Sequence, residues 1–242
     1  MRVVARCDRM HGVTEPLVLV AHGSRDDAAH ACIEDIVDAA RTALPAVEVR
    51  LAYVDVRGPK VAEVVAELDG AVVVPAFLAS GYHVRVDLPA RLADAGAPLD
   101  RFPVTPAIGP DPLLARAARG RLAEAGWGHG DAVVLAAAGS SDAAALAEVR
   151  VAGRMLAAEV GRKTRVGFVA TATPRVDAVV AGLRAAGERR IAVASWLLAP
   201  GVFHTRLAGA GADVVAAPLG AHPDVVATVV ARYHAAARPA AA

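Results

Sequence analysis

The sequence predicts an α/β protein of two similar lobes, each a parallel sheet flanked by helices, related by an internal duplication. Two observations carry this prediction. Short β-branched runs alternate with longer amphipathic segments, which is typical of parallel sheets with helical crossovers. In addition, the segment 21–26 recurs at 137–142 with Gly, Ser and Asp in the same places, each copy directly after an apolar run. Ala138 stands in the second copy where the first has His22, so we expect reactive groups in one lobe only.

The first lobe is expected to span residues 17–126. Its β-branched runs indicate strands and its amphipathic segments indicate helices. Leu44-Pro45 ends the first helix, because proline disfavours a helical conformation in the residue before it. Strands are expected near 17–21, 47–54, 71–76 and 103–107, and helices near 26–44, 58–68, 86–95 and 111–125.

The second lobe is expected to span residues 131–236, after a glycine-rich stretch at 126–130 that indicates a linker. Residues 1–16 are expected to form a flexible leader, and residues 237–242 a tail that frays. In the second lobe strands are expected near 132–137, 165–170, 190–196 and 213–217, and helices near 142–160, 174–186 and 222–236.

Further matches between the halves support the duplication. Gly23 and Gly139 are 116 residues apart, and the later matches keep the same order with small drifts in spacing. The repeat is too long for a solenoid unit and instead indicates two α/β lobes. The matched segments are 53–54 with 168–169, 59–61 with 174–176, 77–81 with 197–201 and 108–112 with 219–223.

Composition excludes several function classes. A net charge of +1 gives no reason to expect nucleic acid or a membrane surface as a partner, and no apolar run reaches the roughly 20 residues of a membrane span. Neither a Walker loop nor a Gly-x-Gly-x-x-Gly turn follows a strand, so no nucleotide is expected. The two cysteines, Cys7 and Cys32, form no cluster, so no iron–sulfur centre is expected, and the default location is the cytoplasm.

Candidate functional residues follow successive strands of the first lobe. In open parallel sheets ligands bind outside the carboxyl ends of the strands, where His22, Asp55 and His83 are expected. The matching places in the second lobe hold Ala138, Thr171 or a neighbour, and His204. The first lobe is therefore expected to bring two imidazoles and a carboxylate together.

The chemistry open to such a trio is restricted. Two imidazoles and one carboxylate suit a divalent transition metal with open coordination positions. The same groups can also accept protons near neutral pH, where histidine titrates. Ser24 is not part of a Gly-x-Ser-x-Gly elbow, so nucleophilic catalysis is not indicated.

The sequence resembles the sirohydrochlorin chelatase family, the class II, ATP-independent chelatases. The resemblance rests on the segments 19–26, 53–55 with Pro59, and 74–89, and it is sharper in the first lobe than in the second. It implies the class II chelatase architecture of two flavodoxin-like halves. It also implies insertion of ferrous iron or cobalt, as a substrate, into sirohydrochlorin during siroheme or cobalamin biosynthesis.

The resemblance also implies roles for individual residues. His22 and His83 correspond to the metal-handling histidines of the family, and Asp55 stands where the family has a glutamate. His204 lies three residues after Gly201, whereas His83 lies two after Gly81, so His204 is not counted as an equivalent ligand.

The implied substrate, sirohydrochlorin, carries eight carboxylates, for which arginine is a suitable bidentate partner. Residues expected to hold these carboxylates are Ser24, Arg25, Arg85 and Arg206. Neither nucleic acid nor a membrane is expected as a partner, and the chain is expected to act as a monomer or homodimer. Two alternatives remain open: a protein of the same fold that binds a metal or tetrapyrrole without turnover, and a chelatase for another tetrapyrrole such as protoporphyrin.

Overall fold

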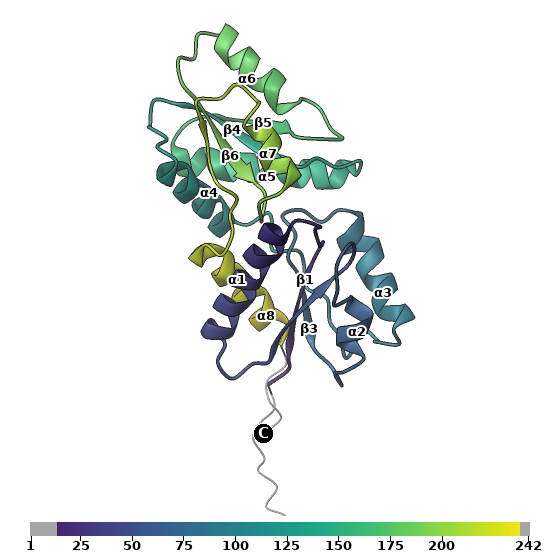
Figure 1. Ribbon diagram of the computed structural model, residues 1–242. Helices are drawn as coiled ribbons and strands as arrows, with labels where there is room; N and C mark the ends of the chain where they lie inside the picture. Colours follow the sequence, from purple (N-terminus) through teal and green to yellow (C-terminus); the bar gives the residue numbers. More distant parts are fainter. Residues whose placement is uncertain (1–13, 238–242) are drawn as a thin grey trace, which may run out of the picture.

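A computed structural model of the chain describes residues 14–237, which form two α/β lobes stacked one above the other (Figure 1). The expectations of a flexible leader and a fraying tail fall almost entirely on residues 1–13 and 238–242, which lie outside the described part. The predicted fold class is confirmed: each lobe contains a parallel sheet covered by helices.

The N-terminal sheet has three parallel strands in the order β2-β1-β3. They are β1 (Leu17–Ala21), β2 (Val49–Tyr53) and β3 (Val72–Pro75). The strand expected at 103–107 is reduced to a single bridge between Val73 and Val104. Pro103 and Pro106 flank this bridge and have no backbone N–H to donate, which explains why the pairing does not extend.

Both faces of the N-terminal sheet are covered, which explains the unbroken apolar run of β1. Leu17 and Leu19 belong to the core on the side of α1 (Asp27–Ala43), whereas Val18 and Val20 pack with side chains of α2 (Val61–Val65) and α3 (Leu88–Asp94). The helix expected at 58–68 is shorter than predicted. The helix expected at 86–95 begins earlier, because a π-helical turn, η1 (His83–Asp87), leads directly into α3.

The C-terminal sheet has four parallel strands in the order β5-β4-β6-β7. The strands are β4 (Ala132–Ala137), β5 (Thr164–Phe168), β6 (Ile191–Trp196) and β7 (Val214–Val215). Helices α5 (Ala143–Val160) and α6 (Val176–Ala185) were expected. The short α7 (Val202–Leu207), which follows Pro200 and Gly201, was not predicted.

The two lobes exchange their last helices. Helix α4 (Pro112–Glu124) packs against α5 and β6 of the C-terminal lobe, and α8 (Pro223–Ala236) returns to pack against α1 and β3 of the N-terminal lobe (Figure 1). The limits expected from the sequence, 17–126 and 131–236, therefore describe the repeat, whereas each packed lobe contains a helix from the other half. One core cluster runs through both lobes as a result.

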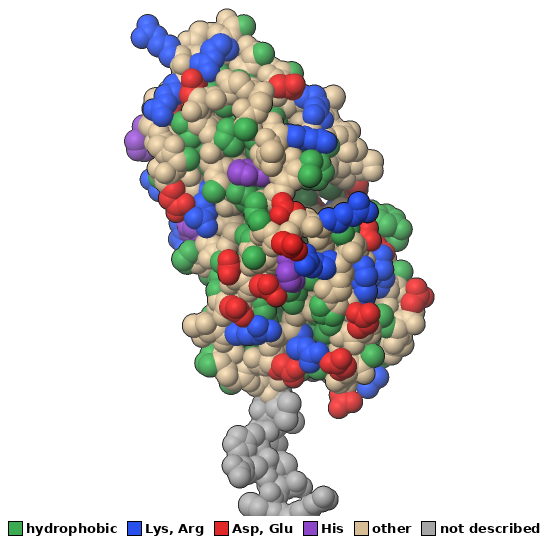
Figure 2. Space-filling view, viewed as in Figure 1, with side chains coloured by type: hydrophobic (Ala, Val, Ile, Leu, Met, Phe, Trp, Pro, Cys, Tyr) green, Lys and Arg blue, Asp and Glu red, His purple; other side chains and the backbone are tan. Residues whose placement is uncertain are grey.

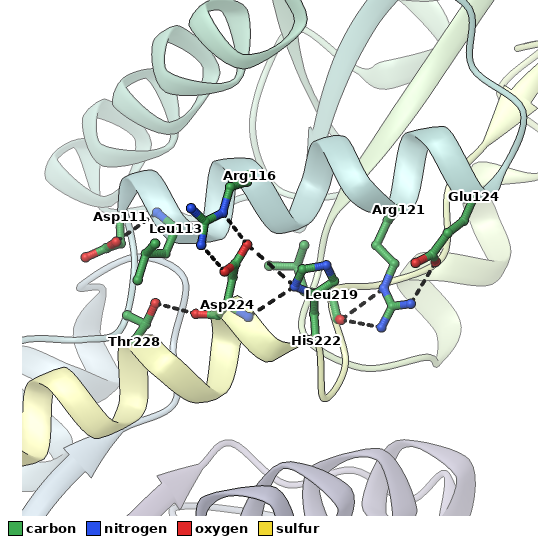
Figure 3. A network of polar contacts seen from close by, with 9 residues as sticks. All are labelled: Asp111, Leu113, Arg116, Arg121, Glu124, Leu219, His222, Asp224 and Thr228. Atoms are coloured by element: carbon green, nitrogen blue, oxygen red, sulfur yellow. Dashed lines mark hydrogen bonds and ion pairs between the residues drawn. The ribbon is translucent and has the colours of Figure 1, made fainter. Parts of the chain in front are cut away.

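A polar network joins α4 to α8 where they cross (Figure 3). Arg116 pairs with both carboxylate oxygens of Asp224, and Arg121 donates two hydrogen bonds to the carbonyl oxygen of Leu219. The Asp224 side chain is only 11% exposed, and the hydrogen bond from Arg116 lowers the pKa of that carboxyl. Because the carboxylate is buried and paired, this contact helps to hold the two lobes in one arrangement.

The duplication is visible in the backbone of the loops after β1 and β4. Gly23 and Gly139 have φ values of +97° and +100°, a region that glycine adopts readily. Asp26 and Asp142 cap α1 and α5 in the same way, accepting hydrogen bonds from the amides of Ala28 and Ala144. The two loops therefore have the same conformation although only the first contains a histidine.

The described part of the chain has charged side chains of both signs on its surface, and none of its helices is suited to cross a membrane. On the face drawn in Figure 2, acidic and basic side chains are interspersed over the N-terminal lobe, and no broad area of one sign is seen there. None of the helices formed by residues 14–237 combines the length and apolar character that crossing a membrane requires.

Candidate functional site

A cleft of about 920 Å³ lies between the lobes, at the carboxyl ends of the central strands of both sheets. The segments that line it follow β1 and β3 in the N-terminal lobe and β4 and β6 in the C-terminal lobe. Cavities of this size hold small ligands and cofactors, and strand carboxyl ends are where open α/β sheets bind them. The expected place of the site is therefore also the place of a substantial cavity.

His22 and His83 meet in this cleft. His22 directly follows β1, and His83 is the first residue of the π-helical turn η1. Their ring centroids are 4.7 Å apart, with the ring planes at 89° to each other. Phe77 stacks on the His83 ring with a centroid distance of 6.3 Å. The structure thus brings together the two imidazoles that the sequence singled out, although they lie 61 residues apart.

The hydrogen bonds of the two rings determine which nitrogen of each is free. Nδ1 of His22 lies 3.1 Å from the carbonyl oxygen of Gly23, and Nδ1 of His83 lies 2.9 Å from Oδ2 of Asp87. Both partners are acceptors, so Nδ1 carries the proton in each neutral imidazole. The lone pair is then on Nε2 of both rings. Such an arrangement can offer two nitrogen ligands to a metal or two acceptors to protons.

Asp87 is a residue in contact with the histidine pair that the sequence analysis missed. Its side chain is 15% exposed, and Oδ1 accepts a 2.8 Å hydrogen bond from Nε of Arg91. Burial by itself raises the pKa of Asp87, but hydrogen bonds from His83 and Arg91 outweigh it and hold that pKa below its ordinary value. The carboxylate therefore stays ionised and orients His83. The i, i+4 spacing of His83 and Asp87 is the signal that could have revealed it.

The backbone amide of Asp55 donates a 3.0 Å hydrogen bond to the carbonyl oxygen of His22, but Asp55 is not among the residues that line the cleft. Its Oδ1 accepts a 2.7 Å hydrogen bond from the amide of Val56, a residue with a φ of 58°. That hydrogen bond is the main reason why the pKa of Asp55 is lowered, with the nearby His22 among the smaller causes. Between residues 14 and 237, no three His, Cys, Asp or Glu side chains are placed to hold a metal ion together. Of the expected trio, His22 and His83 form a pair, and Asp55 interacts electrostatically with His22.

The residues expected to hold substrate carboxylates have different surroundings. Ser24 and Arg25 line the cleft, and the Ser24 hydroxyl also accepts a hydrogen bond from the amide of Asp26. Arg85 and Arg206 are not among the lining residues. Arg85 instead reaches across to the C-terminal lobe, where its Nη2 donates a 3.0 Å hydrogen bond to Glu148. Arg85 therefore links the two lobes at the edge of the cleft.

The corresponding places of the C-terminal half carry no such chemistry. Ala138 is the counterpart of His22. The counterpart of Asp55 is Ala170, the neighbour of Thr171, because the Ala170 amide donates to the carbonyl oxygen of Ala138 as the Asp55 amide donates to that of His22. His204 lines the cleft, but its Nε2 lies 3.2 Å from the carbonyl oxygen of Ala216. Its Nε2 is therefore engaged as a donor.

Comparison with protein families matches both halves of the chain. The model of the CbiX family matches residues 16–125 and again residues 132–236, which are the two halves of the repeat. No curated protein sequence matches the chain.

Solved structures extend the comparison to the whole fold. The chain is similar to SirB from Bacillus subtilis with Fe³⁺, with a TM-score of 0.77, 19% identity, and coverage of 91% of this chain and 94% of that one. It is also similar to CbiX, described as the terminal enzyme for biosynthesis of siroheme in denitrifying bacteria, with a TM-score of 0.70, 26% identity, and coverage of 92% and 99%. The fold is thus shared over nearly the full length of both. Since the family model covers both halves, the chain belongs to the CbiX family, and the predicted membership of the sirohydrochlorin chelatases is confirmed.

Proposed function

We propose that this protein inserts a divalent metal, ferrous iron or cobalt, into sirohydrochlorin. The observation that carries the proposal is the edge-to-face pair of His22 and His83 in the cleft between the lobes. Support also comes from similar structures: SirB from Bacillus subtilis subspecies spizizenii is described as a sirohydrochlorin chelatase in complex with cobalt, and the SirB structure named above holds Fe³⁺.

The reaction exchanges two protons for one metal ion. Two macrocycle nitrogens lose their protons, and the divalent metal binds to the ring nitrogens in their place. We assign two successive tasks to Nε2 of His22 and Nε2 of His83, since each nitrogen carries one free lone pair: it holds the incoming metal, and once the metal has passed to the macrocycle the freed lone pair accepts one of the two protons. Neutral imidazole suits ferrous iron and cobalt alike, so this pair does not favour one metal.

Both walls of the cleft come from the two lobes of a single molecule. We therefore propose that a monomer is sufficient for activity. Arg25 is the cleft-lining cation among the expected clamps, so we assign it to one of the substrate carboxylates.

An absorbance assay tests the proposed function. Metal-free sirohydrochlorin is mixed anaerobically with ferrous iron, or separately with cobalt, and the change in its visible spectrum is followed with and without the protein. We expect the protein to accelerate insertion over the background reaction. Tight binding of sirohydrochlorin without acceleration would instead identify a binding protein of the same fold and overturn the proposed catalytic activity.

Asp87→Ala is expected to reduce the rate of insertion and the affinity for the metal alone by about tenfold to 100-fold, as loss of a ligand-orienting partner typically does. The physical reason is the loss of the acceptor that fixes the His83 ring. The rate is measured by absorbance and the affinity by calorimetry with cobalt. Asp94→Ala on the exposed side of α3 is the matched control and should resemble the wild type. Equal rates and affinities in the two variants would contradict the role of Asp87.

A further inference from the structure

The two walls of the cleft differ in chemical character. The N-terminal half contributes ionisable side chains, including those of His22, Arg25 and His83. Among the described residues, His204 is the one ionisable side chain that the C-terminal half adds to the lining, and its Nε2 is bound to the carbonyl of Ala216. One wall can therefore carry out acid–base and metal chemistry, whereas the opposite wall offers mainly apolar surface.

Strand register identifies the counterpart of His83 on the apolar wall. Val20 pairs with Pro75 in the first sheet, and Ala136 pairs with Ser195 in the second, so Pro75 and Ser195 occupy equivalent positions. The chain then runs without insertion or deletion in either half to Gly81 and Gly201, after which a helical segment begins in both halves. Continued in this register, the residue equivalent to His83 is Phe203.

Phe203 is unusually exposed for an aromatic residue. It lines the cleft and is 41% exposed, and its neighbour Val202 also lines the cleft and is 66% exposed. Large apolar side chains are normally buried, and exposed ones gathered in a cleft mark a binding surface. At the position where the first half presents an imidazole, the second half thus presents an aromatic ring.

We propose that the apolar wall formed by Val202 and Phe203 is the platform on which the tetrapyrrole ring of the substrate lies. This inference rests on the proposed function. Aromatic side chains bind flat conjugated rings through dispersion and offset stacking, without needing a matching charge. With one face of the macrocycle on this platform, the other face is presented to His22 and His83. The metal and both protons then pass through the same face of the ring.

Binding of metal-free sirohydrochlorin to the full-length protein tests the platform. The titration follows quenching of tryptophan fluorescence, since Trp196 lines the cleft. Phe203→Ala is expected to weaken binding about tenfold, in line with the loss of one stacking ring, and Val202→Ala by a smaller factor. Phe203→Tyr keeps the flat ring and should bind within about twofold of the wild type. Leu99→Ala removes an apolar side chain that is 55% exposed outside the cleft and serves as the matched control.

A split between substrate affinity and turnover separates a platform from a structural role. In Phe203→Ala the KM for sirohydrochlorin should rise about tenfold while kcat changes less than about threefold, because the histidine pair is untouched. Unchanged affinity in Phe203→Ala would overturn the platform even if the wild type inserts metal well. Phe203-dependent binding without any insertion would support the platform and overturn the proposed catalytic function instead.

Discussion

Alanine at position 83 or at position 22 is expected to lower the rate of metal insertion by about 100-fold or more, the usual contribution of a positioned acid–base group. Each substitution removes one Nε2 lone pair from a pair of rings whose centroids are 4.7 Å apart. A single remaining imidazole can hold the metal with only one ligand, so both presentation of the metal and removal of protons suffer. The rate is measured by the absorbance of sirohydrochlorin at saturating ferrous iron or cobalt.

Loss of activity in these variants should occur without loss of the fold. His22 is exposed, and the His83 side chain is 36% exposed, so neither substitution opens a cavity in the core. Thermal unfolding of both variants should therefore lie close to that of the wild type. Wild-type rates of insertion in both variants would show that the histidine pair does not perform the chemistry.

The second large effect concerns the stability of the loop that carries His22. Gly23→Ala is expected to destabilise the protein by about 3 kcal/mol or more, since it combines a positive φ with a backbone clash. An added Cβ at Gly23 would lie 2.2 Å from the carbonyl oxygen of Asp55, a contact that only a shift of the backbone can relieve. For a chain of this size the loss corresponds to a melting temperature about 6–12 °C lower.

Gly126→Ala is the matched control for this substitution. Gly126 also has a positive φ, of +86°, but an added Cβ there would meet nothing within 4 Å. Its cost should therefore be that of the backbone conformation alone, about 1–2 kcal/mol. Chemical denaturation with urea measures both variants. If both glycine substitutions cost the same, the close approach of the loop to Asp55 would not be important for the fold.

Sequence patterns predicted the strands best where both faces of a sheet are buried. β1, β4 and the carboxyl end of β6 lie at the expected residues, because a strand covered on both sides is a continuous apolar run. The exchange of α4 and α8 could not be predicted in this way. The repeat shows that the two helices are equivalent, but which sheet each one covers depends on packing between segments far apart in the sequence.

The sequence predicted those parts of the candidate site whose positions depend on where the strands end. His22 follows β1 directly and His83 comes after the loop that leaves β3, so parallel pairing of these two strands brings both histidines to the same edge of the sheet. The carboxylate of Asp55 accepts a hydrogen bond from the amide of the next residue, Val56, a local contact with no clear sequence signal. Arg85 is engaged by Glu148, a partner 63 residues away on the other lobe. Long-range polar partners of this kind are visible only once the lobes are packed together.

The central claim is that this duplicated fold has one reactive wall, in the N-terminal half. The most direct test compares His22→Ala with His204→Ala in the same insertion assay, because both residues are histidines that line the same cleft. We predict that His22→Ala loses about 100-fold or more in rate. The rate of His204→Ala should stay within about twofold of the wild type, because its Nε2 already donates to Ala216. A damaging His204→Ala together with a harmless His22→Ala would contradict the claim and place the chemistry in the C-terminal half.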